Sequence, residues 1–123
     1  MSADTRRSAT AQAEAFLPLK PVWFHILITL AEQPAHGYAI RQAVEARTDG
    51  QIRLWPTTLY GTLGQLEAAG LIDEIAGAGS DEAVPRRTYR LSTLGKHVLS
   101  AETDRLKHLL DLARAAMGRR RLT

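Results

Sequence analysis

Hydroxyl and amide side chains gather in one short segment, "WPTTLYGTLGQLEAAGLI" over residues 55–72. Thr57 and Thr58 follow Pro56 directly, and Gln65 comes further along the same segment. A threonine hydroxyl can bind a phosphate or a base edge, its methyl group can contact thymine, and a glutamine can bond adenine through two hydrogen bonds. The amides of a helix N-terminus also favour phosphate. These residue types therefore indicate contact with a nucleic acid.

The leucines of this segment predict a helix that buries one narrow face. That face is formed by three leucines at helical spacing, Leu59, Leu63 and Leu66. Tyr60, Gly61 and Gly64 then lie outward or on the flanks, which keeps the outer surface thin enough for a major groove about 12 Å wide. Gly70 is placed to cap the helix. The plainer alternative is that the two threonines merely start the helix and that Tyr60 packs against a neighbouring element.

A pair of arginines, Arg86 and Arg87, follows Pro85 in a region that predicts a β-hairpin. "LIDEIAG" and "RRTYRLS" both alternate apolar with polar residues, which indicates strands over about 71–76 and 85–91. The two arginines could grip phosphates from the flank of the hairpin. Alternatively, they are solvated charges that protect a strand edge. The acidic pair at 81–82 would repel phosphate, so the flank and not the tip is expected to approach DNA.

Residues that most often carry catalysis or bind metals show no such pattern. The four histidines (25, 36, 97 and 108) lack metal-ligand spacing, there is no cysteine, and no phosphate-cradling glycine motif follows a predicted strand. The acidic pairs at 73–74 and 81–82 are better explained as solvated charge in the hairpin. We therefore expect no enzymatic activity, no metal site and no cofactor.

The elements that would position these residues follow a recognisable order. Helices are predicted over 21–32, from about His36 to the Asp49-Gly50 stop, and over the segment from Pro56 to Gly70, with a short edge strand or loop at 51–55. Ser92 offers an N-cap to a last helix that runs to about Met117. Three helices followed by a β-hairpin form the winged helix-turn-helix arrangement. The predicted fold is mainly α with a small β-hairpin, and its long C-terminal helix is expected to dimerise.

The last helix carries more apolar surface than one small domain needs. Its heptad-like seam predicts a two-fold dimer through Leu99, Leu106, Leu109, Leu110, Ala113 and Met117. Packing on the chain's own first helix would account for part of this stripe.

The 123 residues are enough for one core, and the net charge of +3 permits nucleic-acid binding without arguing for it. No apolar run is long enough to span a membrane, no secretory h-region is seen, and cysteine is absent, which together predict a cytoplasmic protein. The domain organisation we expect is a flexible polar arm over 1–17, a winged helix-turn-helix domain over 18–91, the dimerisation helix over 92–117 and a basic tail over 118–123.

Three blocks in the right order, "HGYAI", "PTTLYGTLGQLEAAGLI" and "RRTYRLSTLGKHVL", resemble the PadR family of transcriptional regulators. The resemblance covers roughly residues 18–117 and is to the short branch of the family, which ends in a single helix. It implies a homodimeric winged-helix protein that binds double-stranded DNA, usually as a repressor and often released by a small-molecule effector. The symmetry of a two-fold dimer in turn predicts an inverted-repeat operator. The third helix would be the recognition helix, with Tyr60 as the family tyrosine and Arg86 and Arg87 on the wing.

Two departures and one alternative accompany this resemblance. Thr57 stands where a glycine is common in the family, and Thr93 where an acidic residue is common. Trp23 and Trp55 could line an effector pocket, but Trp23 fits the core better, and Trp55 lies at the N-cap or N′ position of the third helix, where it could staple that helix.

The competing interpretation is a winged-helix module that binds protein and not DNA, favoured by the balanced charge of residues 52–96.

Overall fold

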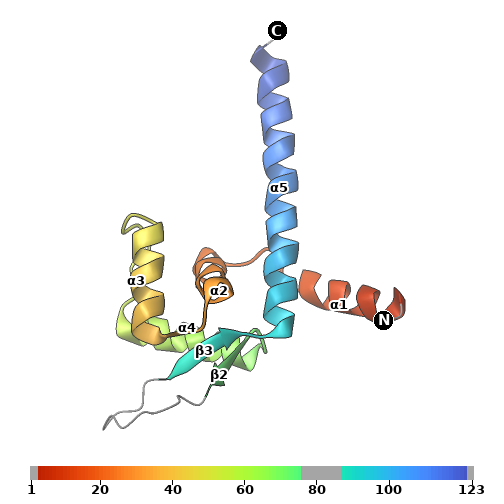
Figure 1. Ribbon diagram of the computed structural model, residues 1–123. Coiled ribbons are helices and arrows are strands. Elements are labelled where there is room, and N and C mark those ends of the chain that lie inside the picture. Colours follow the sequence, from red (N-terminus) through yellow and green to blue (C-terminus); the bar gives the residue numbers. More distant parts are fainter. Residues whose placement is uncertain (1–2, 76–86, 122–123) are drawn as a thin grey trace.

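The computed structural model describes residues 3–75 and 87–121. The elements in chain order are α1 (Ala3–Glu14), α2 (Pro21–Glu32), β1 (Ala35–His36), α3 (Gly37–Arg47), α4 (Pro56–Ala68), β2 (Ile72–Ile75), β3 (Thr88–Leu91) and α5 (Thr93–Arg121). In Figure 1, α2 and α3 stand above the small sheet, α4 runs behind it, and α5 rises away from them. The mainly helical, winged helix-turn-helix fold predicted from the sequence is confirmed.

The core lies where α2, α3, α4, the sheet and the start of α5 meet. Its members are fully or almost fully buried aliphatic side chains together with one tyrosine, among them Ile26, Leu27, Ile40, Val44, Leu59, Leu63, Leu66, Leu71, Ile72, Tyr89 and Val98. Pro21 begins α2, as the sequence predicts, because proline fits the first helical position, where no amide hydrogen is needed. Trp23 packs partly buried against this core, as expected.

The sheet has three antiparallel strands in the order β1-β3-β2. Ile72 pairs with Leu91 and Glu74 with Tyr89, while Ala35 pairs with Tyr89 from the other side. The predicted hairpin strands are present over their described parts, but the short strand is not at 51–55. That segment is a loop, and the extra strand is β1, because the free edge of β3 takes its partner from the connection between α2 and α3.

Helix α5 begins at the expected cap. The Ser92 hydroxyl accepts a hydrogen bond from the Gly95 amide at 2.9 Å and donates one to the Gly70 carbonyl at 2.6 Å. The predicted end near Met117 is wrong, because the helix continues to Arg121. Gly118 does not stop it, because one glycine costs only about 1 kcal/mol inside a helix and the residues around it are strong helix formers.

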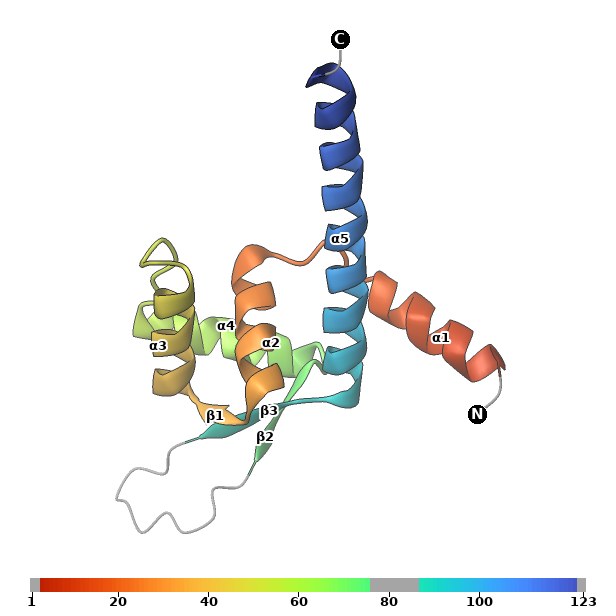
Figure 2. The same ribbon diagram turned by 45° about the horizontal axis from the view of Figure 1, so that its top comes forward.

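The flexible arm expected over residues 1–17 is instead helical over most of its length. Helix α1 packs on α5, on the side of α5 away from α2, as both views in Figures 1 and 2 show. Ala13 is buried in this contact. Alanine-rich sequence favours helix intrinsically, and the α5 surface supplies the packing that a short isolated helix lacks.

A buried carboxylate joins α5 to the segment before α2. Glu102 is 2% exposed, and its Oε2 accepts a hydrogen bond from the Leu19 amide at 2.7 Å. Arg105 donates to both carboxylate oxygens, so the buried charge is paired and hydrogen-bonded. These bonds hold the pKa of Glu102 below its ordinary value, chiefly through Arg105. Within the described residues, no helix is long and apolar enough to cross a membrane.

Candidate nucleic-acid interface

Helix α4 has two contrasting faces. Leu59, Leu63 and Leu66 are buried in the core, as the leucine spacing predicts. The helix stops at a Schellman motif: Gly70 has a φ of 79°, the Gly70 amide bonds the Glu67 carbonyl, and the Leu71 amide bonds the Leu66 carbonyl. A stop at this position leads the chain directly into β2.

The opposite face of α4 is polar, exposed and low in profile. Thr57, Thr58 and Gln65 are all exposed. A Cβ atom added at Gly61 or Gly64 would meet nothing within 4 Å, so these glycines are not required for packing. The structure therefore brings three of the predicted contact residues onto one surface that another molecule can approach.

Tyr60 has a packing role as well as an exposed surface. Its ring lies so close to Gly37 that a Cβ atom there would stand 3.0 Å from both Cε1 and the hydroxyl oxygen of Tyr60. The side chain is nevertheless 51% exposed. Gly37 thus allows the start of α3 to approach α4, and Tyr60 joins the two helices while presenting half of its surface to solvent. This contact agrees with the plainer alternative for Tyr60 and leaves a role at the surface open to it.

The two strands of the wing pair their charges across the sheet. Arg87 Nε lies 3.7 Å from Glu74 Oε1, and Arg90 Nε lies 3.9 Å from Asp73 Oδ2. A hydrogen bond with Tyr89 and the charge of Glu74 raise the pKa of Arg87, so it stays cationic. Arg87 is exposed, as predicted, but its charge is offset by a neighbour. Arg86 and the acidic pair at 81–82 lie outside the described residues.

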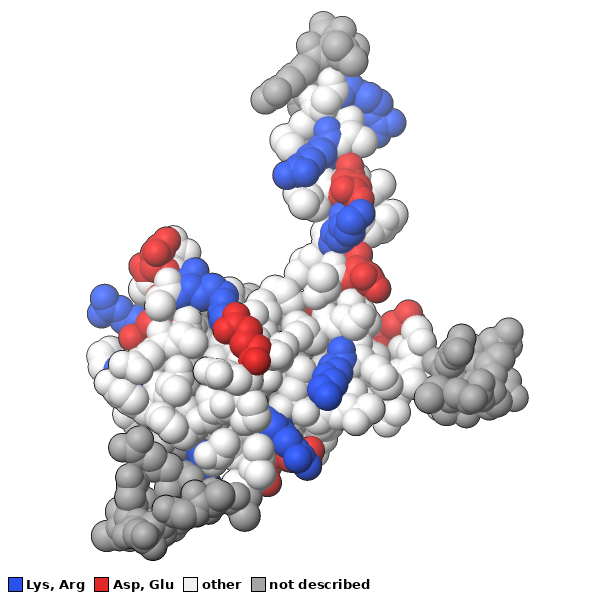
Figure 3. All heavy atoms as spheres, in the orientation of Figure 1, with Lys and Arg blue, Asp and Glu red and all other residues white. Residues whose placement is uncertain are grey.

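Charge on the face shown in Figure 3 is mixed. Blue and red side chains alternate over the helices and along α5, and the basic ones do not form a single stripe. A nucleic-acid contact on this face would therefore rest on individually placed groups.

The far part of α5 presents an apolar face to solvent. Leu106, Leu109, Leu110 and Met117, all in the predicted dimer set, are 37%, 46%, 48% and 61% exposed, and Ala113 is also exposed. Leu99, the remaining member, packs partly buried against the core of its own chain. Leu112, which is 53% exposed, adds to the same helix. The first part of α5 thus belongs to the domain, and the second part carries unpartnered leucines.

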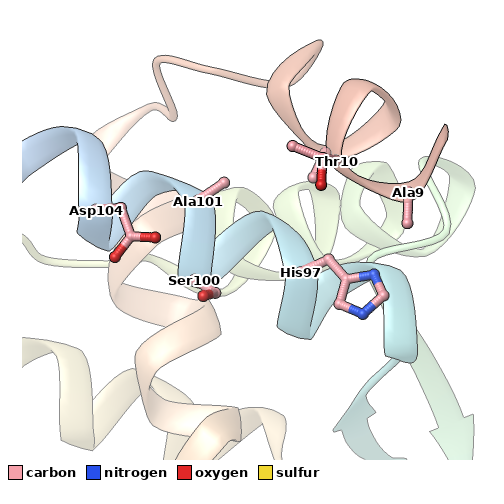
Figure 4. Close-up of a pocket in the computed structure, with 7 residues that line it drawn as sticks. Ala9, Thr10, His97, Ser100, Ala101 and Asp104 are labelled. Carbon is pink, nitrogen blue, oxygen red and sulfur yellow. The ribbon is translucent and has the colours of Figure 1, made fainter. Parts of the chain in front are cut away.

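A hollow of about 320 Å³ lies between α1 and α5. Ala9 and Thr10 come from α1, and His97, Ser100 and Asp104 follow one another along α5 (Figure 4). Ala101 points from α5 toward α1 in this view. Among the described residues, no group of three or more histidine or acidic side chains is placed to hold a metal ion.

The sequence does not identify Gly37 as the neighbour of Tyr60 or Leu19 as a partner of Glu102, and it predicts a different role for Trp55. The Gly37–Tyr60 contact and the Glu102–Leu19 hydrogen bond join residues far apart in the chain, and only the glycine in "HGYAI" gave any signal. Trp55 occupies the N-cap of α4, as expected, but does not staple it. Its side chain is 63% exposed, and Arg41 Cζ lies 5.9 Å from the centre of its ring.

Helices α3 and α4 are followed by the antiparallel strands β2 and β3. This order defines a winged helix-turn-helix protein, in which the two strands form the wing. Residues 26–101 match the family model described as the transcriptional regulator PadR-like family. The chain therefore belongs to the PadR-like family of transcriptional regulators, as its resemblance implied.

Similar proteins of known structure share this fold. A transcriptional regulator from Clostridium thermocellum superposes with a TM-score of 0.63 at 23% identity, covering 94% of this chain and 96% of its own. A PadR family transcription regulator from Clostridium difficile gives a TM-score of 0.66 at 19% identity, covering 80% of this chain and 99% of its own. Bacillus subtilis PadR in complex with operator DNA gives 0.58 at 20% identity, covering 68% of this chain and 45% of its own.

A curated relative extends well beyond this chain. It is an uncharacterized 37.1 kDa protein of a Streptomyces fradiae transposon, 36% identical over 84 residues that make up 68% of this chain. The chain spans only 22% of the length of that relative.

Proposed function

We propose that this protein regulates transcription by binding double-stranded DNA through the outer face of α4. The observation that carries the proposal is the division of that helix. Leu59, Leu63 and Leu66 are 2%, 0% and 0% exposed. Thr57, Thr58 and Gln65 are exposed to solvent, and the two glycines of the helix add no side chain to that face. A thin polar helix face suits a major groove. The likeness in fold to Bacillus subtilis PadR, solved with operator DNA, supports the same use here.

Duplex binding measured at several salt concentrations tests this function. Phosphate contacts make the logarithm of the affinity fall linearly with the logarithm of the salt concentration. Thr57→Ala and Gln65→Ala should each weaken binding, by roughly 5- to 150-fold if the side chain makes a good base contact. Lys107→Ala removes an exposed charge from α5 and serves as the control, with unchanged binding expected.

The competing protein-interaction module has its own outcome in this experiment. A chain that binds no duplex at low salt, or binds it without salt dependence, contradicts the DNA-binding proposal and supports the module. Duplex binding that survives the Thr57→Ala, Gln65→Ala double variant would instead show that our assignment of α4 residues is wrong.

The exposed leucines of α5 support a homodimer in this proposal. A contiguous apolar face on a solvent-exposed helix marks an interaction site, and a second copy of the same helix covers it symmetrically. A two-fold dimer would present two α4 helices to DNA and recognise an inverted repeat, with half-sites about one turn, ~34 Å, apart. Repression is the expected effect, because the family resemblance implies it.

Release by a small molecule, which the family resemblance implies, has a candidate place in the α1–α5 hollow. Hydroxyl, imidazole and carboxylate groups of Thr10, His97, Ser100 and Asp104 line it together with alanine methyl groups. A ligand held there would change how α1 packs on α5 and shift the population of DNA-competent dimers. Ala101→Leu, which fills the hollow, should abolish the response of duplex binding to any such effector while leaving basal binding unchanged. A response that persists in this variant would place the effector elsewhere.

A further inference from the structure

Aromatic side chains are exposed around the start of α4. Outside α5, the large apolar or aromatic side chains exposed among the described residues are Tyr38 at 59%, Trp55 at 63% and Tyr60 at 51%. They come from the first turn of α3 and from the first residues of α4 and its N-cap. Tyr60 is explained by its contact with Gly37, but the exposure of Trp55 has no such explanation in the packing.

We propose that Trp55 and Arg41 together form a second contact with the DNA backbone, in which the indole ring holds the Arg41 guanidinium against a phosphate. This proposal rests on the DNA binding proposed above and adds a positioning residue, Trp55, and a phosphate-binding residue, Arg41.

The Arg41 side chain is held from two directions. Its Cζ lies 5.9 Å from the centre of the Trp55 ring, and its Nε lies 3.3 Å from Oε1 of Glu45 one turn further along α3. The arginine side chain retains 29% of its exposure. A guanidinium fixed by a ring and a carboxylate has lost most of its freedom already, so binding a phosphate costs it little further entropy. Its planar donors remain suited to phosphate oxygens.

Trp55 does little for the stability of the helix that it precedes. Serine, threonine, aspartate and asparagine are preferred at an N-cap because their side chains accept amide hydrogen bonds, and the Trp55 side chain makes no such bond. The other tryptophan, Trp23, is different: that ring packs partly buried on the core beneath Lys20, whose Nζ lies 5.7 Å from the ring centre. The chain thus has one tryptophan used in packing and one left at the surface.

The neighbours of Trp55 point to a nucleic-acid backbone as its occupant. Thr57 and Thr58, two and three residues on, belong to the exposed face proposed for base contact, so the two surfaces are continuous. Arg41 supplies a guanidinium whose planar donors complement a phosphate, and its pair with Glu45 offsets only part of its charge because the carboxylate contacts the guanidinium through Nε. A duplex whose major groove holds α4 carries its backbone past the start of that helix.

Tryptophan fluorescence tests the contact directly. Trp23→Phe leaves Trp55 as the single tryptophan of the chain, because the sequence contains two. Addition of duplex DNA to this variant should quench and shift the Trp55 emission in proportion to binding. Unchanged emission at saturation, with binding followed by anisotropy of the labelled duplex, overturns the proposal.

A set of variants measures the role of each residue. Arg41→Ala should weaken duplex binding about five- to tenfold and lower the salt slope by about 0.9 for each phosphate that is no longer bound. Trp55→Ala should weaken binding less, and the double variant should resemble Arg41→Ala alone, because the ring acts through the arginine. Arg41→Lys keeps the charge but removes the planar group, and should restore only part of the affinity. Lys20→Ala, the matched control at the other tryptophan, should bind as the parent does.

The outcomes separate this proposal from the one on which it rests. If the parent binds duplex while Arg41→Ala and Trp55→Ala bind equally well, the second contact is wrong and the α4 interface stands. If the effects of the two substitutions add in the double variant, Trp55 does not act through Arg41, and the positioning role is overturned. A parent chain that binds no duplex overturns the proposed function, and this contact with it. Trp55→Leu, which removes the aromatic face but keeps a large apolar side chain, repeats the measurement should the alanine variant unfold.

Discussion

Replacement of Glu102 by glutamine should destabilise the protein far more than an ordinary change of surface charge. The carboxylate is 2% exposed and accepts hydrogen bonds from the Leu19 amide and from two nitrogens of Arg105. Glutamine keeps one acceptor oxygen and places an NH₂ group where the other stood. At least one donor therefore loses its acceptor, and the Arg105 guanidinium loses the negative charge that it pairs with. A hydrogen bond to a charged group contributes about 1.5–3 kcal/mol, and Arg105 can regain some hydration because it is 33% exposed.

We therefore expect Glu102→Gln to lower the free energy of unfolding by about 2 kcal/mol, which corresponds to a fall in Tm of roughly 6–12 °C for a chain of this size. Thermal unfolding followed by circular dichroism measures it, at fixed protein concentration because dimerisation would make Tm concentration-dependent. The matched control is Asp111→Asn, which breaks the exposed 3.2 Å Lys107–Asp111 pair on the same helix. Its effect should stay within about 0.5 kcal/mol.

The same variant has a predicted pH dependence. The pKa of Glu102 in the folded protein is lowered, mainly by the hydrogen bond from Arg105. A carboxyl group whose pKa is lowered by folding stabilises the fold fully when the pH is above its ordinary pKa of 4.5. That stabilisation is lost as the pH falls through the lowered pKa of the folded protein. The difference between parent and Glu102→Gln should be constant near neutral pH and shrink in acid. A variant as stable as Asp111→Asn, or a difference that grows in acid, would refute this role of the carboxylate.

Three further outcomes follow from the described contacts. Glu74→Gln should raise duplex affinity about two- to fivefold at low salt, with the gain vanishing at high salt, because it releases Arg87 from a 3.7 Å ion pair and removes a negative charge near the DNA; weaker binding would contradict this. Leu109→Asp should convert dimers to monomers in sedimentation experiments, since it places a charge in the 46% exposed apolar stripe, and dimers that persist would exclude that stripe. Gly37→Ala should lower the urea midpoint by an amount equivalent to about 1–3 kcal/mol, because its methyl group meets the Tyr60 ring at 3.0 Å; an unchanged midpoint would show that the ring moves freely.

Local signals explain the elements that the sequence predicted well. Helix α2 begins at Pro21 and ends at Glu32, as expected, because prolines mark both boundaries. Gly70 likewise predicts the end of α4, because the cap of that helix needs a residue with a positive φ. Strand β1 gave no signal, because two residues cannot show an alternating pattern.

Features that depend on distant residues could not be predicted from the chain alone. The exposed face of α4 followed from the leucine spacing, but the pairing of Arg87 with Glu74 depends on the position of each residue in the sheet. One partner of Glu102 is an amide 83 residues away, and the pair with Arg105 at i,i+3 looks like any surface pair on a long helix. The sequence does not predict helix α1, because its composition is polar and a single buried alanine, Ala13, produces no apolar periodicity.

The central claim is that two α4 helices, held by paired α5 helices, recognise a specific duplex. Recovery and sequencing of duplexes bound from a random library test it most directly. We predict enrichment of an inverted repeat with half-sites about one helical turn apart, and disappearance of that enrichment in the Thr57→Ala, Gln65→Ala double variant. Recovery of no enriched sequence, or of an unpaired site that the double variant still selects, would contradict the claim.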